Sequence, residues 1–174
     1  MQPRMILCVM GLVLLVFRPE LSSAEAYGWV SPAVATCEAM GVPGTLALAV
    51  ILTESRGQLY AIRINAGAGV SLYPTTYEAA QRVATVSLLQ TDNVDLGLMQ
   101  VNYRHHGRPR GVTPAELLQP HVNLRIGCTV LKDALASDGP IWQRLGRYHS
   151  GSPTRQWAYA LRVTRWLELL TKAE

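Results

Sequence analysis

The stretch that decides the fold is residues 45–54, TLALAVILTE, which Ser55-Arg56-Gly57 follows at once. It is apolar nearly all round and ends in a single acid, Glu54, so we expect a buried central helix with a carboxyl group at its end. Desolvation and the negative end of the helix dipole both disfavour a charged carboxylate there. Glu54 is therefore expected to keep its proton long enough to act as an acid. The alternative is a helix-terminal glutamate whose carboxyl simply reaches water.

The N-terminus has the pattern of a secretory signal peptide. Arg4 precedes an apolar run over residues 5–17, and small residues follow at Ser22-Ser23-Ala24. The run is short for a bilayer span, so we expect a cleaved signal over residues 1–24 and one domain over 25–174. An uncleaved membrane anchor is the alternative. Cleavage at Ala24 and at Ala26 both fit the pattern.

The charge of the exported chain argues against nucleic acid as a partner. Without residues 1–24 the chain keeps 14 basic and 11 acidic residues, a net charge of +3, and it has no basic run interleaved with aromatics. A mild positive charge instead favours an anionic polymer such as a cell wall. The hydrophobic content of 49% and charged content of 16% suit one compact domain.

Two cysteines, Cys37 and Cys128, remain after the predicted signal. In an exported protein such a pair can form a disulfide. Two separately buried thiols are the alternative, because the sequence does not place their Cα atoms within bonding reach.

Most of the remaining chain predicts helices, so the expected fold class is α+β and predominantly α-helical. Capping boxes are expected at Thr75 with Glu78 and at Thr113 with Glu116. The helices are expected over about 31–40, 75–88, 114–119, 121–136, from 140 onward, and from 153 to about 170. Between them, 61–65 and 70–73 alternate as a small hairpin, and 91–95 is expected to be a loop.

Two further segments carry polar groups suited to a sugar. Residues 95–102 contain Gly97, where a backbone can approach a ligand closely, and the amides Gln100 and Asn102. Such amides pair with hydroxyl and acetamido groups. The segment Tyr148-His149-Ser150-Gly151 places a phenol beside a helix end and a glycine turn.

Three segments in this order, Glu54-Ser55-x-Gly57, Gly97-Leu-Met-Gln-Val-Asn102 and Tyr148-His-Ser-Gly151, resemble the lysozyme-like (SLT-type) lytic transglycosylases. The resemblance covers roughly residues 37–163 and is greatest to the small single-domain branch found with conjugation and type IV secretion systems. It implies a lysozyme-like fold with a central buried helix, and the hairpin looks like an insertion of one branch.

The resemblance implies that Glu54 is the catalytic acid and base. Ser55, Gly97, Met99, Gln100 and Asn102 would form the glycan groove, with Tyr148 facing the reacting sugar. Enzymes of this family cleave the β-1,4 bond between N-acetylmuramic acid and N-acetylglucosamine, leaving a 1,6-anhydro end. The resemblance also implies an exported, periplasmic protein. Its partners would be peptidoglycan strands and possible components of a conjugation or type IV secretion system. Membrane contact would occur only through the signal segment before cleavage.

One carboxylate suffices for this reaction, whereas most glycosidases need two. The acetamido oxygen of the substrate can stabilise the reacting centre, and its own 6-hydroxyl is the nucleophile. Two alternative functions stay open. The first is hydrolysis, as in the goose-type lysozymes, in which Asp92 and Asp95 could hold a water molecule; these residues could equally cap backbone groups in a polar turn. The second is a non-catalytic wall-binding protein on the same fold.

Other chemistries find little support. The spacing of the histidines is not that of metal ligands, and this holds for all four: His105, His106, His121 and His149. The adjacent pair, His105 and His106, would point apart in a strand or loop. No metal or cofactor is therefore expected. Ser55 lacks an evident His/Asp relay. His149 stands where many relatives carry asparagine. The tryptophans, Trp142, Trp157 and Trp166, are expected to pack in the helical core.

Overall fold

The computed structural model describes residues 28–172, so the predicted signal peptide lies outside the described residues. The helices are α2 Val30–Glu38, α3 Gly44–Glu54, α4 Tyr77–Leu88, α5 Pro114–Leu117, α6 Pro120–Ala136, α7 Ile141–Arg147 and α8 Pro153–Thr171, and the strands are β1 Ile62–Ile64, β2 Val70–Leu72, β3 Val94–Leu96 and β4 Val101–Asn102. A π-helical turn over Tyr103–Gly107 and a 3-10 turn over Arg108–Arg110 follow β4. The expected α+β class, mainly helical, is confirmed.

Helix α3 is the central buried helix, as its apolar sequence predicts. Ala47, Ala49, Val50 and Ile51 have no exposed surface, and α3 packs against both α2 and α8. Its apolar character on all sides therefore follows from having neighbours on more than one face.

A disulfide between Cys37 of α2 and Cys128 of α6 closes the base of this helical group, with the two Cα atoms 5.3 Å apart. The structure therefore contains the pairing that the sequence left open.

The expected hairpin is present, but it belongs to a larger sheet. The strand order is β2-β1-β3-β4, all antiparallel, with Ile62 paired to Leu72 on one side and to Leu96 on the other. The expectation of a loop over 91–95 is wrong at its C-terminal end. Val94 and Leu96 alternate with Asp95 and bury their side chains, which is the pattern of a short, half-buried strand.

The two predicted capping boxes have different outcomes. Thr113 and Glu116 form the expected reciprocal box at α5. At α4 the cap is Thr76 rather than Thr75, because the extended backbone of Thr76 lets its hydroxyl accept a hydrogen bond from Ala79 N at 3.2 Å.

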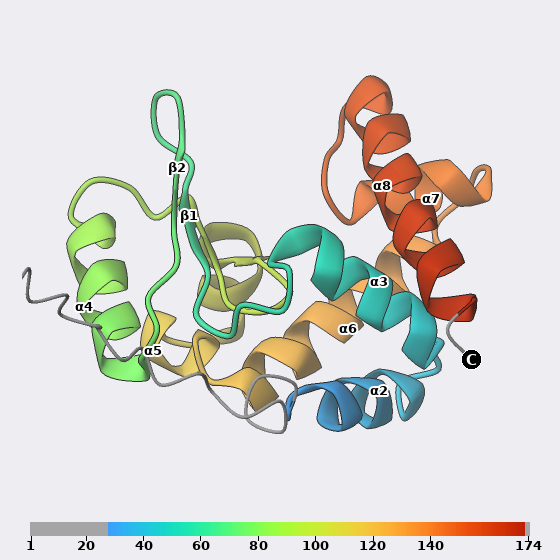
Figure 1. Ribbon diagram of the computed structural model, residues 1–174. Helices are drawn as coiled ribbons and strands as arrows, with labels where there is room; N and C mark the ends of the chain where they lie inside the picture. Colours follow the sequence, from blue (N-terminus) through green and yellow to red (C-terminus); the bar gives the residue numbers. More distant parts are fainter. Residues whose placement is uncertain (1–27, 173–174) are drawn as a thin grey trace, which may run out of the picture.

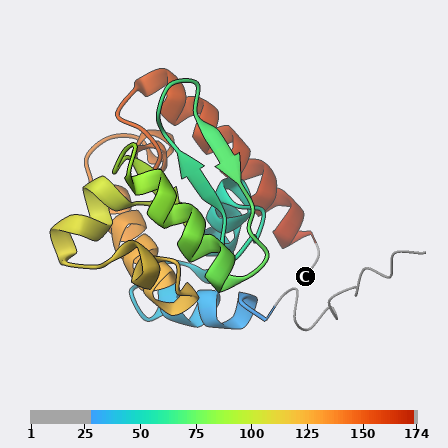
Figure 2. The same cartoon turned by 90° about the vertical axis from the view of Figure 1, so that its left-hand side faces the viewer.

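Above α6, the other helices and strands are arranged in two groups. Helices α3, α7 and α8 stand together on one side, and the β1–β2 hairpin with α4 stands on the other (Figure 1). Figure 2, turned by 90°, shows α4 lying beside the hairpin, in agreement with their packing. Among residues 28–172, no helix combines the length and apolar character needed to cross a membrane.

Candidate active site

A cleft of about 940 Å³ lies between the helical side and the sheet. One wall, here called the helical wall, comes from the end of α3 and from the α7–α8 segment. The other, the sheet wall, comes from β1, β2, β3, β4 and the turn after β4. The lining residues include Glu54, Tyr148, His149, Arg147, Arg155 and Arg162 on the helical wall, and Arg63, Asn65, Asn93, Asp95, Gln100, Asn102 and His105 on the sheet wall.

Glu54 is the last residue of α3, and its side chain is 12% exposed in the cleft. The chain turns sharply after it, because Arg56 and Gly57 both adopt left-handed backbone conformations. Glycine is required at position 57, since a Cβ there would lie 2.6 Å from the Trp29 ring. The turn leaves the carboxyl group of Glu54 at the end of a rigid, buried helix.

A stack of rings surrounds Glu54. His149 Nδ1 lies 3.8 Å from Glu54 Oε1, and the imidazole stacks on the Tyr159 ring at a centroid distance of 4.7 Å and an interplanar angle of 4°. Burial, reinforced by the charge of Glu54, raises the pKa of the Tyr159 phenol well above its usual range. The Tyr159 hydroxyl has no well-formed hydrogen bond within residues 28–172, although it is near enough to Glu54 to sense that charge.

Tyr148 lies at the edge of this stack, and its hydroxyl donates a hydrogen bond to the carbonyl of Met99 at 2.7 Å. Burial raises the pKa of the Tyr148 phenol well above its usual range, and the charges of Glu54 and Asp95 act in the same direction. The phenol therefore stays neutral, and its proton is already engaged. What Tyr148 can offer a substrate is a lone pair that accepts a hydrogen bond.

The sheet wall holds a second carboxyl group, Asp95, in the cleft. Asn65 Nδ2 donates to its Oδ2 at 2.7 Å, and Asn102 Nδ2 donates to its Oδ1 at 2.6 Å. Burial raises the pKa of Asp95, while these two hydrogen bonds act to lower it and the charge of Glu54 acts to raise it. The partners of Asp95 are side-chain amides, so the expectation of a backbone-capping turn residue is wrong here.

The two predicted amides, Gln100 and Asn102, both line the cleft, but the N–H groups of both side chains are already engaged. Gln100 Nε2 donates to the carbonyls of Ala61 at 3.0 Å and Gly97 at 2.9 Å. Asn102 Nδ2 donates to Asp95 Oδ1, and its Oδ1 accepts from His105 N at 3.1 Å. These side chains shape the sheet wall more than they offer free donors to a sugar.

Ser55, Gly97 and Met99 do not line the cleft; the structure places them behind it. The Ser55 hydroxyl donates to Ile51 O and accepts from Gly57 N, both at 3.2 Å. Met99 is fully buried, and its backbone N donates to Asn123 Oδ1 at 2.8 Å. Gly97 has φ +76°, and a Cβ there would collide with the Asn123 amide. All three support the walls from within the core.

Asp92, the other candidate acid, does not line the cleft. Arg104 lies 2.5 Å and Arg108 3.0 Å from its carboxylate oxygens. The hydrogen bond from Arg104, with the charge of that residue and the contact to Arg108, lowers the pKa of Asp92. It is a surface ion-pair residue, and Asp95 alone of the two acids reaches the cleft.

The cleft also contains residues that sequence reasoning did not single out, notably Arg63, Asn65 and Arg155, and Tyr159 lies beneath it. Arg63 and Asn65 alternate with Ile62 and Ile64 along β1, so the period-2 pattern of the predicted hairpin could have indicated a polar face. No comparable signal placed Tyr159 next to Glu54, since those residues are more than a hundred positions apart.

The histidines at 105 and 106 lie in the π-helical turn rather than in the strand or loop expected for them. Their ring centroids are 6.4 Å apart. Within the described part of the chain, no three His, Cys, Asp or Glu side chains are arranged to hold a metal ion.

Trp142 and Trp166 pack against the core, as expected, whereas Trp157 does not. Trp142 and Trp157 meet edge to face at 5.4 Å, and Trp157 is 50% exposed. Neither they nor Trp166 line the cleft.

The arrangement defines a class of protein: a lysozyme-like domain with one carboxyl group at the end of its central helix, facing a polar cleft. Comparison with known families agrees with this. The model of the Transglycosylase SLT domain matches residues 33–162, so the chain belongs to this family.

Among curated proteins, the chain is similar to the invasion protein IagB of Salmonella typhimurium and of Salmonella typhi. Each is 33% identical over 82 residues, which is 45% of this chain and 51% of the relative. The chain thus spans about half the length of the curated relatives that it matches. No solved structure matches it.

Proposed function

We propose that this protein is an exported lytic transglycosylase that cleaves the β-1,4 bond between N-acetylmuramic acid and N-acetylglucosamine in peptidoglycan. The product would carry a 1,6-anhydro-N-acetylmuramic acid end. The observation that carries the proposal is the position of Glu54, a largely buried carboxyl group at the end of a core helix that lines the cleft.

In the first step Glu54 gives its proton to the glycosidic oxygen, and the bond from that oxygen to C1 of the muramic acid breaks. The acetamido oxygen of the same sugar stabilises the positive charge that develops at C1. Glu54 is then a carboxylate, and it accepts the proton of the 6-hydroxyl as that oxygen attacks C1. Because the nucleophile belongs to the sugar itself, the attack gains a high effective concentration.

The surroundings of Glu54 suit this exchange of roles. The His149 imidazole, 3.8 Å away, and the buried Tyr159 hydroxyl lie where hydrogen-bond donors can steady the carboxylate between the two steps. Tyr148 keeps a free lone pair and can accept a hydrogen bond from the acetamido N–H, since its own proton goes to Met99. This assigns Tyr148 a positioning role.

We further propose that the protein acts in the periplasm and opens the wall locally for a conjugation or secretion apparatus. The support is the predicted signal peptide over residues 1–24 and the resemblance to the small branch found with such systems. Components of that apparatus would be its partners, and no cofactor is required.

A lysozyme-type hydrolase is a second candidate, and one observation favours it. Asp95 lines the same cleft as Glu54 and is held in a fixed position by Asn65 and Asn102. A second fixed carboxylate could orient a water molecule for attack at C1. A non-catalytic wall-binding role would leave the position of Glu54 without a use.

Incubation of the mature protein with purified peptidoglycan tests these functions. A lytic transglycosylase releases muropeptides with 1,6-anhydro ends, and Glu54→Gln abolishes the release while the circular dichroism spectrum stays that of the wild type. Fragments with reducing ends would instead support the hydrolase. Binding to sacculi without any release would support the non-catalytic role and contradict the proposal.

A further inference from the structure

The cleft carries more positive charge than an uncharged sugar polymer would need. Arg63, Arg147, Arg155 and Arg162 line it, while Glu54 and Asp95 supply its carboxyl groups. In the step that requires Glu54 to hold a proton, the excess of positive charge is larger still. Charge of one sign along a cleft raises the local concentration of a ligand of the opposite sign.

Three of these arginines are free to bind a ligand. Arg63, Arg155 and Arg162 are exposed, and within residues 28–172 no carboxylate lies within 4 Å of any of them. Arg147 differs, because its guanidinium already donates to Ser137 Oγ at 2.5 Å and to the carbonyl of Asp138.

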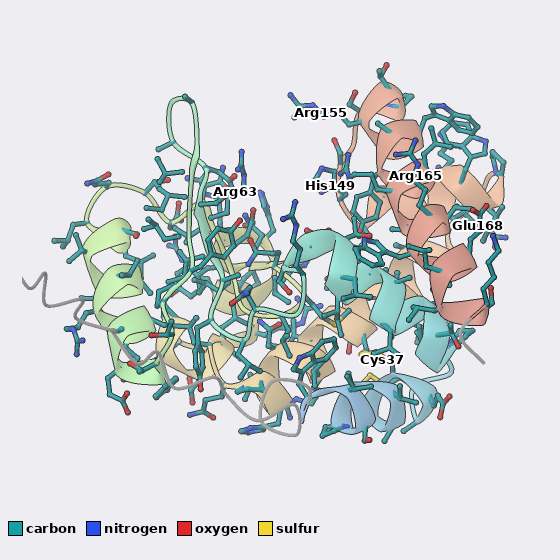
Figure 3. The ribbon with its side chains drawn as sticks, in the orientation of Figure 1. Cys37, Arg63, His149, Arg155, Arg165 and Glu168 are labelled. Atoms are coloured by element: carbon teal, nitrogen blue, oxygen red, sulfur yellow. A yellow bond between two sulfur atoms is a disulfide. The ribbon has the colours of Figure 1, made fainter. Side chains whose placement is uncertain are left out.

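The free arginines lie on both walls. Arg63 rises from the hairpin, while Arg155 and His149 face it from the α7–α8 side (Figure 3). Arg63 is held in place, since its Nε donates to Asn65 Oδ1 at 3.2 Å and its Nη1 to Ser71 Oγ at 3.1 Å. On the opposite wall the Arg162 guanidinium carbon lies 5.5 Å from the centre of the Tyr159 ring, a cation–π contact that limits its motion.

Exposed, positioned guanidinium groups are suited to carboxylates, which they bind through paired hydrogen bonds. In peptidoglycan the glycan backbone is uncharged, and the free carboxylates belong to the short peptides attached to every second sugar. Glu54, where the reacting bond would lie, is largely buried, whereas the arginines are exposed at the edges of the same cleft, where the peptides of a bound strand can reach them.

We propose that the arginines on the two rims, Arg63 on the sheet wall and Arg155 with Arg162 on the helical wall, bind the free carboxylates of the stem peptides. The substrate class is therefore a glycan strand whose attached peptides keep free carboxylates, as opposed to one whose peptide carboxylates are amidated. This inference rests on the proposed function for the placement of the strand, but binding can be measured apart from cleavage.

The test uses two forms of the same sacculi. In one the free amines are acetylated and the carboxylates are kept; in the other the acetylated sacculi are further treated with carbodiimide and excess ammonia, which converts carboxylates to amides. Binding is measured by co-sedimentation with Glu54→Gln protein, so that no cleavage occurs. A parallel assay with the active protein measures KM and kcat for release.

The variants are the double change Arg63→Gln with Arg155→Gln, and Arg165→Gln as a matched control. Arg165 is also an exposed arginine on α8 but does not line the cleft. Exposed ion pairs of this kind change affinity by roughly two- to fivefold each. We expect the double variant to bind the carboxylate form about five- to twentyfold more weakly, and its KM to rise by the same factor while kcat stays unchanged. The affinity of the wild-type protein should fall by a similar factor on the amide form or in 0.5 M salt.

Equal affinity of the wild-type protein for both forms would overturn the inference, as would a loss in Arg165→Gln equal to that of the double variant. Its failure is separate from failure of the proposed function. Anhydro products released equally from both forms would refute the inference alone, whereas carboxylate-dependent binding without any release would refute the proposed function alone.

Discussion

The two walls of the cleft are built differently. On the helical wall, Glu54 projects from the end of a core helix, and stacked rings of His149 and Tyr159 surround it. On the sheet wall, side chains form a network of amide–carboxylate hydrogen bonds around Asp95. One wall thus holds a single carboxyl group rigidly at the end of a core helix, whereas polar groups on short strands define the shape and charge of the other wall.

The largest effect is expected from moving the acid on the helical wall. Glu54→Asp keeps the carboxyl group but withdraws it by about one methylene, roughly 1.5 Å. Misplacement on that scale lowers rates by about a hundredfold, so kcat should fall by that factor with KM little changed. Glu168→Asp, on the exposed surface of α8, is the matched control. A Glu54→Asp enzyme as fast as the wild type would mean that this wall does not hold the reacting group.

The sheet wall should be sensitive to its backbone instead. Gly97→Ala is expected to lower the free energy of unfolding by about 2 kcal/mol or more, because alanine resists the left-handed conformation and its Cβ collides with the Asn123 amide. Gly67→Ala is the control: its φ is also positive, but nothing lies within 4 Å of the added Cβ, so it should lose about 1 kcal/mol. Urea unfolding of the two variants measures the difference, and equal losses would contradict the close packing of Gly97.

How well each wall can be predicted from the sequence depends on how far apart in the chain the interacting residues lie. The helical wall was predicted well, since the apolar run before Glu54 and the glycine after it are local signals. The sheet wall was predicted in part. The hairpin shows its alternation, but β3 is only three residues long and its pairing with β1 spans about thirty positions, so the local pattern around Asp95 predicts a loop instead.

The roles of particular side chains were harder to predict than the elements. Motif resemblance placed Ser55, Gly97 and Met99 in the groove, whereas the structure shows that a motif residue can support a wall from behind. Conversely, the contact of His149 with Tyr159 and Glu54 depends on how α8 packs on α3, which no local pattern in the chain encodes.

The carboxyl group of the sheet wall can be tested through the pH dependence of stability. Burial raises the pKa of Asp95 above its value of about 4 in the unfolded chain, so the folded protein keeps a proton there that the unfolded chain has already released. Asp95 therefore lowers the free energy of unfolding as the pH rises from the unfolded value through the raised folded value. Asp95→Asn removes this loss, so its free energy of unfolding relative to the wild type should rise between pH 3 and pH 7 in urea unfolding. Asp92→Asn, outside the cleft, should not rise in the same comparison, and a constant difference for Asp95→Asn would contradict the raised pKa.

The smallest effect concerns the surface beside the sheet wall. Asp92 has a pKa lowered by Arg104, so its contribution to stability is present above the unfolded value of about 4 and is lost as the pH falls through the lower folded value. Asp92→Asn should be slightly less stable than the wild type at pH 7 in low salt, and equally stable at pH 2 or in 1 M salt. Asp138→Asn changes an exposed aspartate whose carboxylate forms no ion pair within residues 28–172, so it should show no such dependence in thermal unfolding. A difference that persists at pH 2 would contradict the ion-pair explanation.

The proposed reaction is tested by carrying out the cleavage in water enriched in ¹⁸O and measuring the masses of the released muropeptides. If Glu54 acts as acid and then base while the sugar's own hydroxyl closes the ring, the new ends contain no ¹⁸O and are lighter than reducing ends by one water. One ¹⁸O atom in every new end would show that water is the nucleophile and would contradict the central claim.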